Sequence, residues 1–174
     1  ADGRRLAPEM PSAFYRGLTD ADLDAVVAYL RSVPAVDNRM PAPVYHTEVE
    51  PEAWPTATPP DDGKVPDEPA ARGAYLANAA YCMNCHGRGA DARFDSAAPG
   101  HGGLVMRGPW GAVAVADITG AALAGWTDAE IDRALSQGVD RNGESFIPPM
   151  NRARFYSKMT PNDRAALITW LRKL

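Results

Sequence analysis

The sequence has 174 residues, which allows one domain with a tail or two small domains but not three. Hydrophobic residues make up 45% and charged residues 23% of the chain, as in soluble globular proteins, so the composition supports neither wholesale disorder nor a membrane-embedded protein. The formal net charge of −4, from 18 basic and 22 acidic residues, argues against general binding to nucleic acid or to an anionic membrane surface.

The first segment, residues 1–33, is predicted to contain one amphipathic helix. Thr19 is in position to cap its N-terminus, and Pro34 follows its end. Residues 1–30 lack the order of basic, apolar and small residues typical of a signal peptide, and no apolar run in the chain approaches the roughly 20 residues needed to cross a bilayer. The apolar positions of the helix, at helical spacing, are Leu23, Val26, Val27 and Leu30.

The second segment, residues 34–69, is predicted to be a linker. Nine of the 16 prolines fall within it. Its charged residues are acidic apart from Arg39 and Lys64, which gives the segment a net charge of −6. Such a composition favours an extended, solvated chain with little regular structure.

The third segment, residues 70–174, is predicted to be the main globular unit and to be mainly α-helical. Helices are expected over Pro69–Met83, Thr127–Gly138 and Thr160–Leu174, and the last two begin with clear capping residues. The apolar run Ala112–Ala116 has only five residues and is consistent with either a short strand or the wall of a buried loop.

Gly73 lies within the first of these helices. Because glycine has no Cβ atom, two helices can approach each other closely at this residue. We therefore expect the helix from Pro69 to cross the final helix near Trp170 and Leu171.

The beginning and the end of the chain resemble each other. The helix expected after Thr19 and the helix expected after Thr160 have the same apolar spacing, and the residues before them also align. We interpret this similarity as an internal repeat. The aligned segments are Asp2–Gly3 with Asn142–Gly143, Leu6–Met10 with Phe146–Met150, and Phe14–Tyr15 with Phe155–Tyr156.

Residues 82–86 read Cys-Met-Asn-Cys-His, which is the C-x-x-C-H signature of c-type haem attachment. The thiols of Cys82 and Cys85 can each form a thioether with a haem vinyl group. The adjacent His86 then lies under the iron as the proximal ligand. The chain contains no other copy of this motif, so the sequence predicts one covalent haem.

Two other readings of the cysteine pair are weaker. A redox-active thiol pair of the thioredoxin kind needs a βαβ context, which the surrounding Ala-rich and Gly-rich sequence does not provide. A zinc site needs four ligands, and only His46 and His101 remain besides the motif.

The sixth ligand of the iron is expected to be Met150. Pro148 and Pro149 precede it and restrict the backbone, so the thioether can be presented at a fixed place. Met150 also lies 64 residues after His86, which leaves room for the chain to pass around the haem edge. An ordinary packing role is the alternative for this methionine. The other candidates are Met83, Met106, Met159, His46 and His101, of which Met106 and Met159 are the main ones.

Residues 70–174 resemble the class I cytochrome c modules of the multihaem cytochrome subunits of bacterial membrane-bound dehydrogenases for alcohols, sugar acids and aldehydes. Two features depart from those modules: Asp117 stands where they usually carry Asn, and the segment between Thr119 and Gly125 is shortened. Besides the haem motif and the final helix, the matching stretches are Arg72–Leu76, Gly102–Gly103, Pro109–Gly111, Asp117–Thr119, Gly125–Thr127, Gly138–Val139 and Pro148–Met150.

By the same resemblance, residues 1–33 look like the last third of a preceding module, from its axial-methionine loop to its final helix. The attachment motif of that module is absent. Met10 is therefore not expected to bind iron within this chain.

The resemblance implies an electron-transfer protein and not an enzyme, with one covalent haem c and with His86 and Met150 as axial ligands. It implies a dehydrogenase as electron donor and a terminal oxidase or another cytochrome as acceptor. It also implies a periplasmic location, with membrane attachment only through a partner or a missing segment. Arg107, Trp126 and Tyr156 are expected at the haem propionates or the haem edge, because they are near the loops that should surround the cofactor.

Two alternatives from other classes remain open. One is a haem sensor or peroxidase-like protein with an open sixth position. The other is a thiol redox module without haem.

Overall fold

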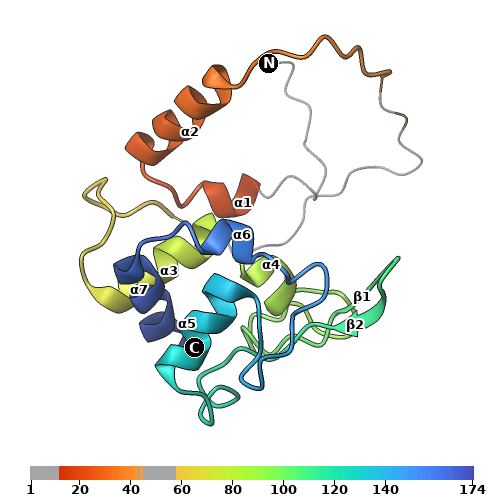
Figure 1. Ribbon diagram of the computed structural model, residues 1–174. Coiled ribbons are helices and arrows are strands. Elements are labelled where there is room, and N and C mark those ends of the chain that lie inside the picture. The colour runs from red at the N-terminus through yellow and green to blue at the C-terminus, as the bar shows by residue number, and fades with distance from the viewer. Residues whose placement is uncertain (1–11, 43, 45–57) are drawn as a thin grey trace. The chain divides into compact units, whose positions relative to one another are not determined.

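The computed structural model describes residues 12–42, 44 and 58–174, and the chain divides into two compact units, residues 1–64 and 65–174 (Figure 1). The division after Lys64 falls within the segment predicted to be a linker. The repeat segment Leu6–Met10, with Met10 itself, and His46 lie outside the described residues.

The described part of the first unit contains two helices, α1 (Ser12–Tyr15) and α2 (Asp20–Ser32). The hydroxyl of Thr19 accepts a hydrogen bond from the backbone N–H of Asp22 at 3.2 Å, so α2 begins where the capping pattern predicts. The chain leaves the helical conformation at Val33, directly before Pro34.

The second unit is mainly helical, as predicted, and it also contains one small sheet. Helix α3 ends at Ala79, before the expected Met83, because Tyr81 has a positive φ of 42° that no α-helix can include. The elements of this unit are α3 (Pro69–Ala79), α4 (Met83–His86), β1 (Val105–Gly108), β2 (Gly111–Ala114), α5 (Asp128–Gln137), α6 (Ala153–Tyr156) and α7 (Pro161–Leu171).

The small sheet is an antiparallel hairpin of β1 and β2, in which Met106 pairs with Val113 and Gly108 pairs with Gly111. Gly111 adopts a φ of 98° at the turn, which a residue with a side chain rarely does. The apolar run that the sequence left undecided thus contributes mostly to a strand. Strand β1 was not predicted, because four residues carry too short a pattern.

The caps of the two long C-terminal helices are those that the sequence predicts. The hydroxyl of Thr127 accepts from the N–H of Glu130 at 3.2 Å, and the carboxylate of Glu130 accepts from the N–H of Thr127 at 2.7 Å. Gly138 ends α5 in the left-handed conformation. Thr160 caps α7 in the same way, through the N–H of Asp163 at 3.1 Å.

Helices α3 and α7 pack closely against each other at Gly73, as expected (Figure 1). A Cβ atom on Gly73 would lie 2.6 Å from the Cβ of Trp170 and would also meet the carbonyl oxygen of Ala166. Ile168 and Leu171 of α7 are buried in one cluster with Ile131 of α5. Helix α7 therefore packs against both α3 and α5 in the core of this unit.

Replacing Gly73 with leucine is expected to lower the free energy of unfolding by about 1 to 3 kcal/mol, because the new side chain overlaps the backbone of α7. Chemical denaturation measures this change. The matched control is Ala71→Leu, which adds the same side chain at an exposed position of the same helix. Equal stability of the Gly73→Leu and Ala71→Leu variants would contradict the close packing of α3 and α7.

An ion pair also joins the beginnings of α3 and α7. The Oδ1 atom of Asp163 accepts hydrogen bonds from Nε and Nη2 of Arg72 at 2.8 and 2.6 Å. Burial raises the pKa of Asp163, but the hydrogen bonds from Arg72 and Thr160 and the Arg72 charge lower it more, so the net shift is downward.

Asp163→Asn is therefore expected to cost about 1 to 2 kcal/mol of stability at neutral pH. Because the pKa of Asp163 is lower in the folded than in the unfolded protein, this contribution is fully present above the unfolded value of about 4 and disappears as the pH falls through the folded value. Denaturation at neutral and at acidic pH tests this. A difference from the unmodified protein that stays constant down to the lowest pH would contradict it. Asp128→Asn, at a mostly exposed partner of Arg172, should cost less.

Candidate haem site

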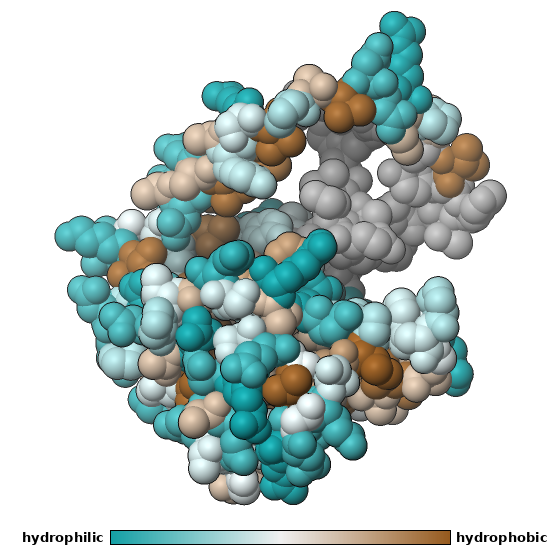
Figure 2. Space-filling model, in the orientation of Figure 1, coloured by the Kyte–Doolittle hydropathy of each residue, from teal (hydrophilic) through white to brown (hydrophobic). Residues whose placement is uncertain are grey.

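A cavity of about 370 Å³ lies within residues 65–174, and its lining is mainly apolar. Aliphatic and aromatic side chains from the hairpin, α5 and α7 form much of this lining, whereas the face of the unit seen in Figure 2 is largely hydrophilic with small, separate apolar patches. The lining from these elements includes Met106, Val113, Ala114, Ile131, Ala134, Leu135, Leu167, Trp170 and Leu171.

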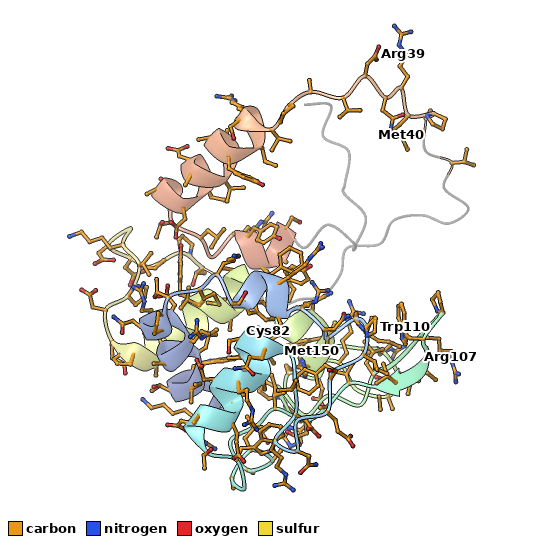
Figure 3. All side chains as sticks on the ribbon, viewed as in Figure 1. Arg39, Met40, Cys82, Arg107, Trp110 and Met150 are labelled. Atoms are coloured by element: carbon orange, nitrogen blue, oxygen red, sulfur yellow. The ribbon has the colours of Figure 1, made fainter. Side chains whose placement is uncertain are left out.

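Six of the seven site residues predicted from the sequence line this cavity: Cys82, Cys85, His86, Trp126, Met150 and Tyr156. Cys82 and Met150, both labelled in Figure 3, come from different segments of the chain and line this same cavity.

Arg107, the seventh, is not among the lining residues. It is exposed on β1, and in Figure 3 it extends from the hairpin beside Trp110. Adjacent residues of a strand face opposite sides, so Met106 faces the cavity and Arg107 faces away from it. Arg107 is thus not brought to the cavity lining with the other six, and its place at the propionates or the haem edge stays a prediction.

His86 ends the short helix α4 and is 8% exposed. Its Nδ1 atom lies 2.8 Å from the carbonyl oxygen of Ala116. A carbonyl only accepts hydrogen bonds, so Nδ1 carries the proton and Nε2 keeps its lone pair for a metal. Burial lowers the pKa of His86, although the bond to Ala116 acts in the opposite direction, and this net shift favours the neutral form that ligates metals.

Because Gly102 has no side chain, the carbonyl of Ala116 can lie within hydrogen-bond distance of the His86 ring. A Cβ atom on Gly102 would lie 2.5 Å from the carbonyl oxygens of Val115 and Ala116, and its φ of 65° is in the left-handed region. Its own N–H donates to the carbonyl of His86 at 2.9 Å. Gly102 thus contacts two segments at once: its N–H binds the backbone of His86, and it packs against the backbone of Ala116, whose carbonyl binds the His86 ring.

Cys82 and Cys85 are both free thiols, and burial raises the pKa of Cys82 to about 11 and also raises the pKa of Cys85. The positive charge of Arg152 opposes this rise at both thiols without cancelling it. Thiol redox modules depend on cysteines with a lowered pKa, so this site does not suit such chemistry. Within the described residues no group of three or more His, Cys, Asp and Glu side chains could hold a metal, which also disfavours a zinc site.

Met150 lies in a tight turn between Ile147 and Arg152. Its N–H donates to the carbonyl of Ile147 at 3.1 Å, and its carbonyl accepts from the N–H of Arg152 at 2.6 Å. Among the other candidate ligands that the structure describes, only Met106 lines the cavity, whereas Met83, Met159 and His101 do not. The structure therefore leaves two methionines, Met150 and Met106, near the attachment motif.

Asp117, which departs from the resembling modules, also lines the cavity. Its Oδ1 accepts hydrogen bonds from the N–H and the hydroxyl of Thr119 at 2.8 and 2.7 Å. A carboxylate therefore replaces the usual amide here as a hydrogen-bond acceptor, and its bonds stabilise the loop that leads to Thr119.

Arg152 and Tyr81 line the cavity and were missed by the sequence reasoning. The Nε of Arg152 donates to the carbonyl of Pro149 at 3.0 Å, and its Nη1 lies 3.4 Å from the hydroxyl of Tyr81, with the guanidinium 5.7 Å from the Tyr81 ring centre. Burial raises the pKa of Tyr156 to about 12, so its hydroxyl stays protonated. The sequence feature that could have indicated Arg152 is its position as a basic residue two places after Met150, the proposed ligand.

Residues 70–174 match the model of the family described as Cytochrome c. The chain belongs to the cytochrome c family. The family implies a covalently bound haem c and indicates an electron carrier and not an enzyme. Among the described residues, no helix combines the length and apolar character needed to cross a membrane.

Curated relatives of this cytochrome c chain include the cytochrome c subunit of a quinone alcohol dehydrogenase from Gluconacetobacter polyoxogenes and the same subunit from Komagataeibacter europaeus. Both are 31% identical over 116 residues, which is 62% of this chain and 23% of theirs. The cytochrome subunit of a fructose dehydrogenase from Gluconobacter japonicus is 30% identical over 104 residues, 58% of this chain and 20% of its own length. These matches confirm the resemblance to dehydrogenase cytochrome modules. The chain spans less than a quarter of the length of these relatives.

The residues that line the cavity fit a c-type haem. The walls are apolar, as the macrocycle requires, and the two thiols and the imidazole of the attachment motif all reach the same space. The Nε2 atom of His86 is the ring nitrogen that remains for iron, because the carbonyl of Ala116 engages the other.

Proposed function

We propose that this chain transfers electrons through a single haem c held by Cys82 and Cys85, with His86 and Met150 as axial ligands. The observation that carries the proposal is that these four side chains line one apolar cavity. When bound, the haem supplies one-electron chemistry, in which its iron alternates between the ferrous and ferric states.

In this proposal His86 and Met150 bind the iron with different consequences. The hydrogen bond from His86 to Ala116 fixes the orientation of the ring and increases the basicity of Nε2 as a ligand. The thioether of Met150 is a soft ligand that favours the ferrous state and so raises the reduction potential. Two strong ligands leave no coordination position for a substrate, which suits an electron carrier.

The remaining lining residues exclude water and hold the cofactor edge. Trp126 and Tyr156 both line the cavity, which supports a role for them at the haem edge or the propionates, whereas Arg107 lacks this support. The hydroxyl of Tyr156 stays protonated at all physiological pH values and can donate a hydrogen bond.

The proposed partners follow from the relatives' names. Because the relatives are cytochrome subunits of an alcohol dehydrogenase and a fructose dehydrogenase, we propose a dehydrogenase as the electron donor. A terminal oxidase or another cytochrome is the proposed acceptor. The cytochrome c motif further suggests a periplasmic location, since haem is attached to this motif outside the cytoplasm in the family.

Carbon monoxide and a redox titration test the proposed function against its alternative, a sensor or peroxidase-like haem protein. We expect the reduced, haem-loaded protein to bind no carbon monoxide at neutral pH and to titrate reversibly with one electron per chain. A haem with an open sixth position would bind the gas at once, and that result would contradict the proposal. Two electrons per chain would contradict the single haem.

A further inference from the structure

The side chain of Arg152 connects two segments that are far apart in the sequence. Its Nε donates to the carbonyl of Pro149 at 3.0 Å, so this bond spans Met150. Its Nη1 reaches the hydroxyl of Tyr81 at 3.4 Å, and its guanidinium lies 5.7 Å from the centre of the Tyr81 ring. Tyr81 directly precedes Cys82. One guanidinium thus links the methionine turn to the start of the attachment motif.

The backbone of Arg152 is fixed as well. Its N–H donates to the carbonyl of Met150 at 2.6 Å, and its carbonyl accepts from the N–H groups of Phe155 and Tyr156 at 2.8 and 3.2 Å. Arg152 therefore forms the junction between the methionine turn and α6. A side chain anchored on such a backbone has little freedom, and its hydrogen bonds transmit a defined position to Met150.

We propose that Arg152 is a positioning residue that clamps the Met150 turn to the attachment segment and places a fixed positive charge beside the cofactor. The inference rests on the proposed function, in which Met150 is the sixth ligand. The clamp keeps the thioether at the iron against competing ligands. The charge favours the ferrous state, because the ferric state adds a positive charge to the same partly buried region.

The alternative is that Arg152 has a purely structural role. Arg154 is an example of an arginine with such a role. Arg154 lies two residues farther along, is exposed, and packs its guanidinium over the Phe155 ring at 4.6 Å. It is not among the residues that line the cavity, whereas Arg152 is. Arg154 therefore provides a matched control, because it is a nearby arginine of α6 that does not line the cavity.

The experiment measures two properties of the haem-loaded protein: the affinity of its ferric form for added imidazole, and its reduction potential. Arg152→Gln is expected to bind imidazole about tenfold more tightly than the unmodified protein, because hydrogen bonds of a charged group that hold the methionine are lost. Its potential should fall. Arg152→Lys keeps the charge without the forked contacts, so imidazole should again bind more tightly while the potential stays nearer the original. Arg154→Gln should change neither property.

Unchanged imidazole affinity and potential in Arg152→Gln would overturn the inference. An unmodified ferric protein without the weak far-red absorption of a methionine–iron bond would overturn the ligand assignment first, and the clamp with it. If Arg152→Gln does not fold, Tyr81→Phe removes only the hydroxyl that Arg152 reaches. That variant should show a smaller increase in imidazole affinity, and an unchanged affinity would count against the clamp.

Discussion

Replacing both Cys82 and Cys85 with alanine is expected to abolish covalent haem attachment completely. These are the only two cysteines of the chain, so no other thiol can form a thioether. Intact mass spectrometry under denaturing conditions should give the polypeptide mass alone for the double variant and the polypeptide plus one haem for the unmodified protein. Each single variant should keep at most one thioether and lose haem more readily on unfolding.

The matched control is Met83→Ala, which changes the same short helix as Cys85→Ala without removing a thiol. Met83→Ala should retain its full haem mass. Haem that can be extracted from the unmodified protein by acidified acetone would contradict covalent attachment. A mass increase of two haems would contradict the single site.

Met150→Ala is expected to open the sixth position and to lower the reduction potential. Because axial ligands set haem potentials over a range of about 0.8 V, the loss of the thioether should shift the value downward by on the order of 0.1 to 0.3 V. The reduced variant should also bind carbon monoxide, which the unmodified protein should not. Potentiometry and gas-binding spectra measure the two effects.

Two methionine variants make this result specific. Met106→Ala tests the other methionine that lines the cavity, and Met159→Ala tests one that does not. Both should keep the original potential within a small margin and should still exclude carbon monoxide. If Met106→Ala opened the iron and Met150→Ala did not, Met106 would be the ligand.

The sequence predicted those parts of the fold that rest on local signals. Helix α5 begins at the capping box of Thr127 and Glu130 and ends at Gly138, because these residues satisfy the free backbone groups of their own helix. The crossing at Gly73 was also predictable, since only glycine lets two backbones approach so closely. The haem motif is likewise a local signal, and its residues Cys82, Cys85 and His86 all line one cavity.

The parts that were not predicted depend on contacts between distant segments. Strand β1 was missed, and with it the fact that Arg107 faces away from the cavity while its neighbour Met106 faces in. The carbonyl of Ala116 reaches His86 from 30 residues away, and Arg152 reaches Tyr81 across 71 residues. Neither pairing has a sequence pattern, because each depends on how the loops pack around the cofactor site.

The absorption spectrum of the oxidised, unmodified protein tests the central claim most directly. The claim is that His86 and Met150 together close the coordination of a single haem. We expect a low-spin ferric spectrum with the weak far-red band of a methionine–iron bond, and this band should disappear in Met150→Ala. A high-spin spectrum without that band would contradict the claim and would favour a haem with an open sixth position.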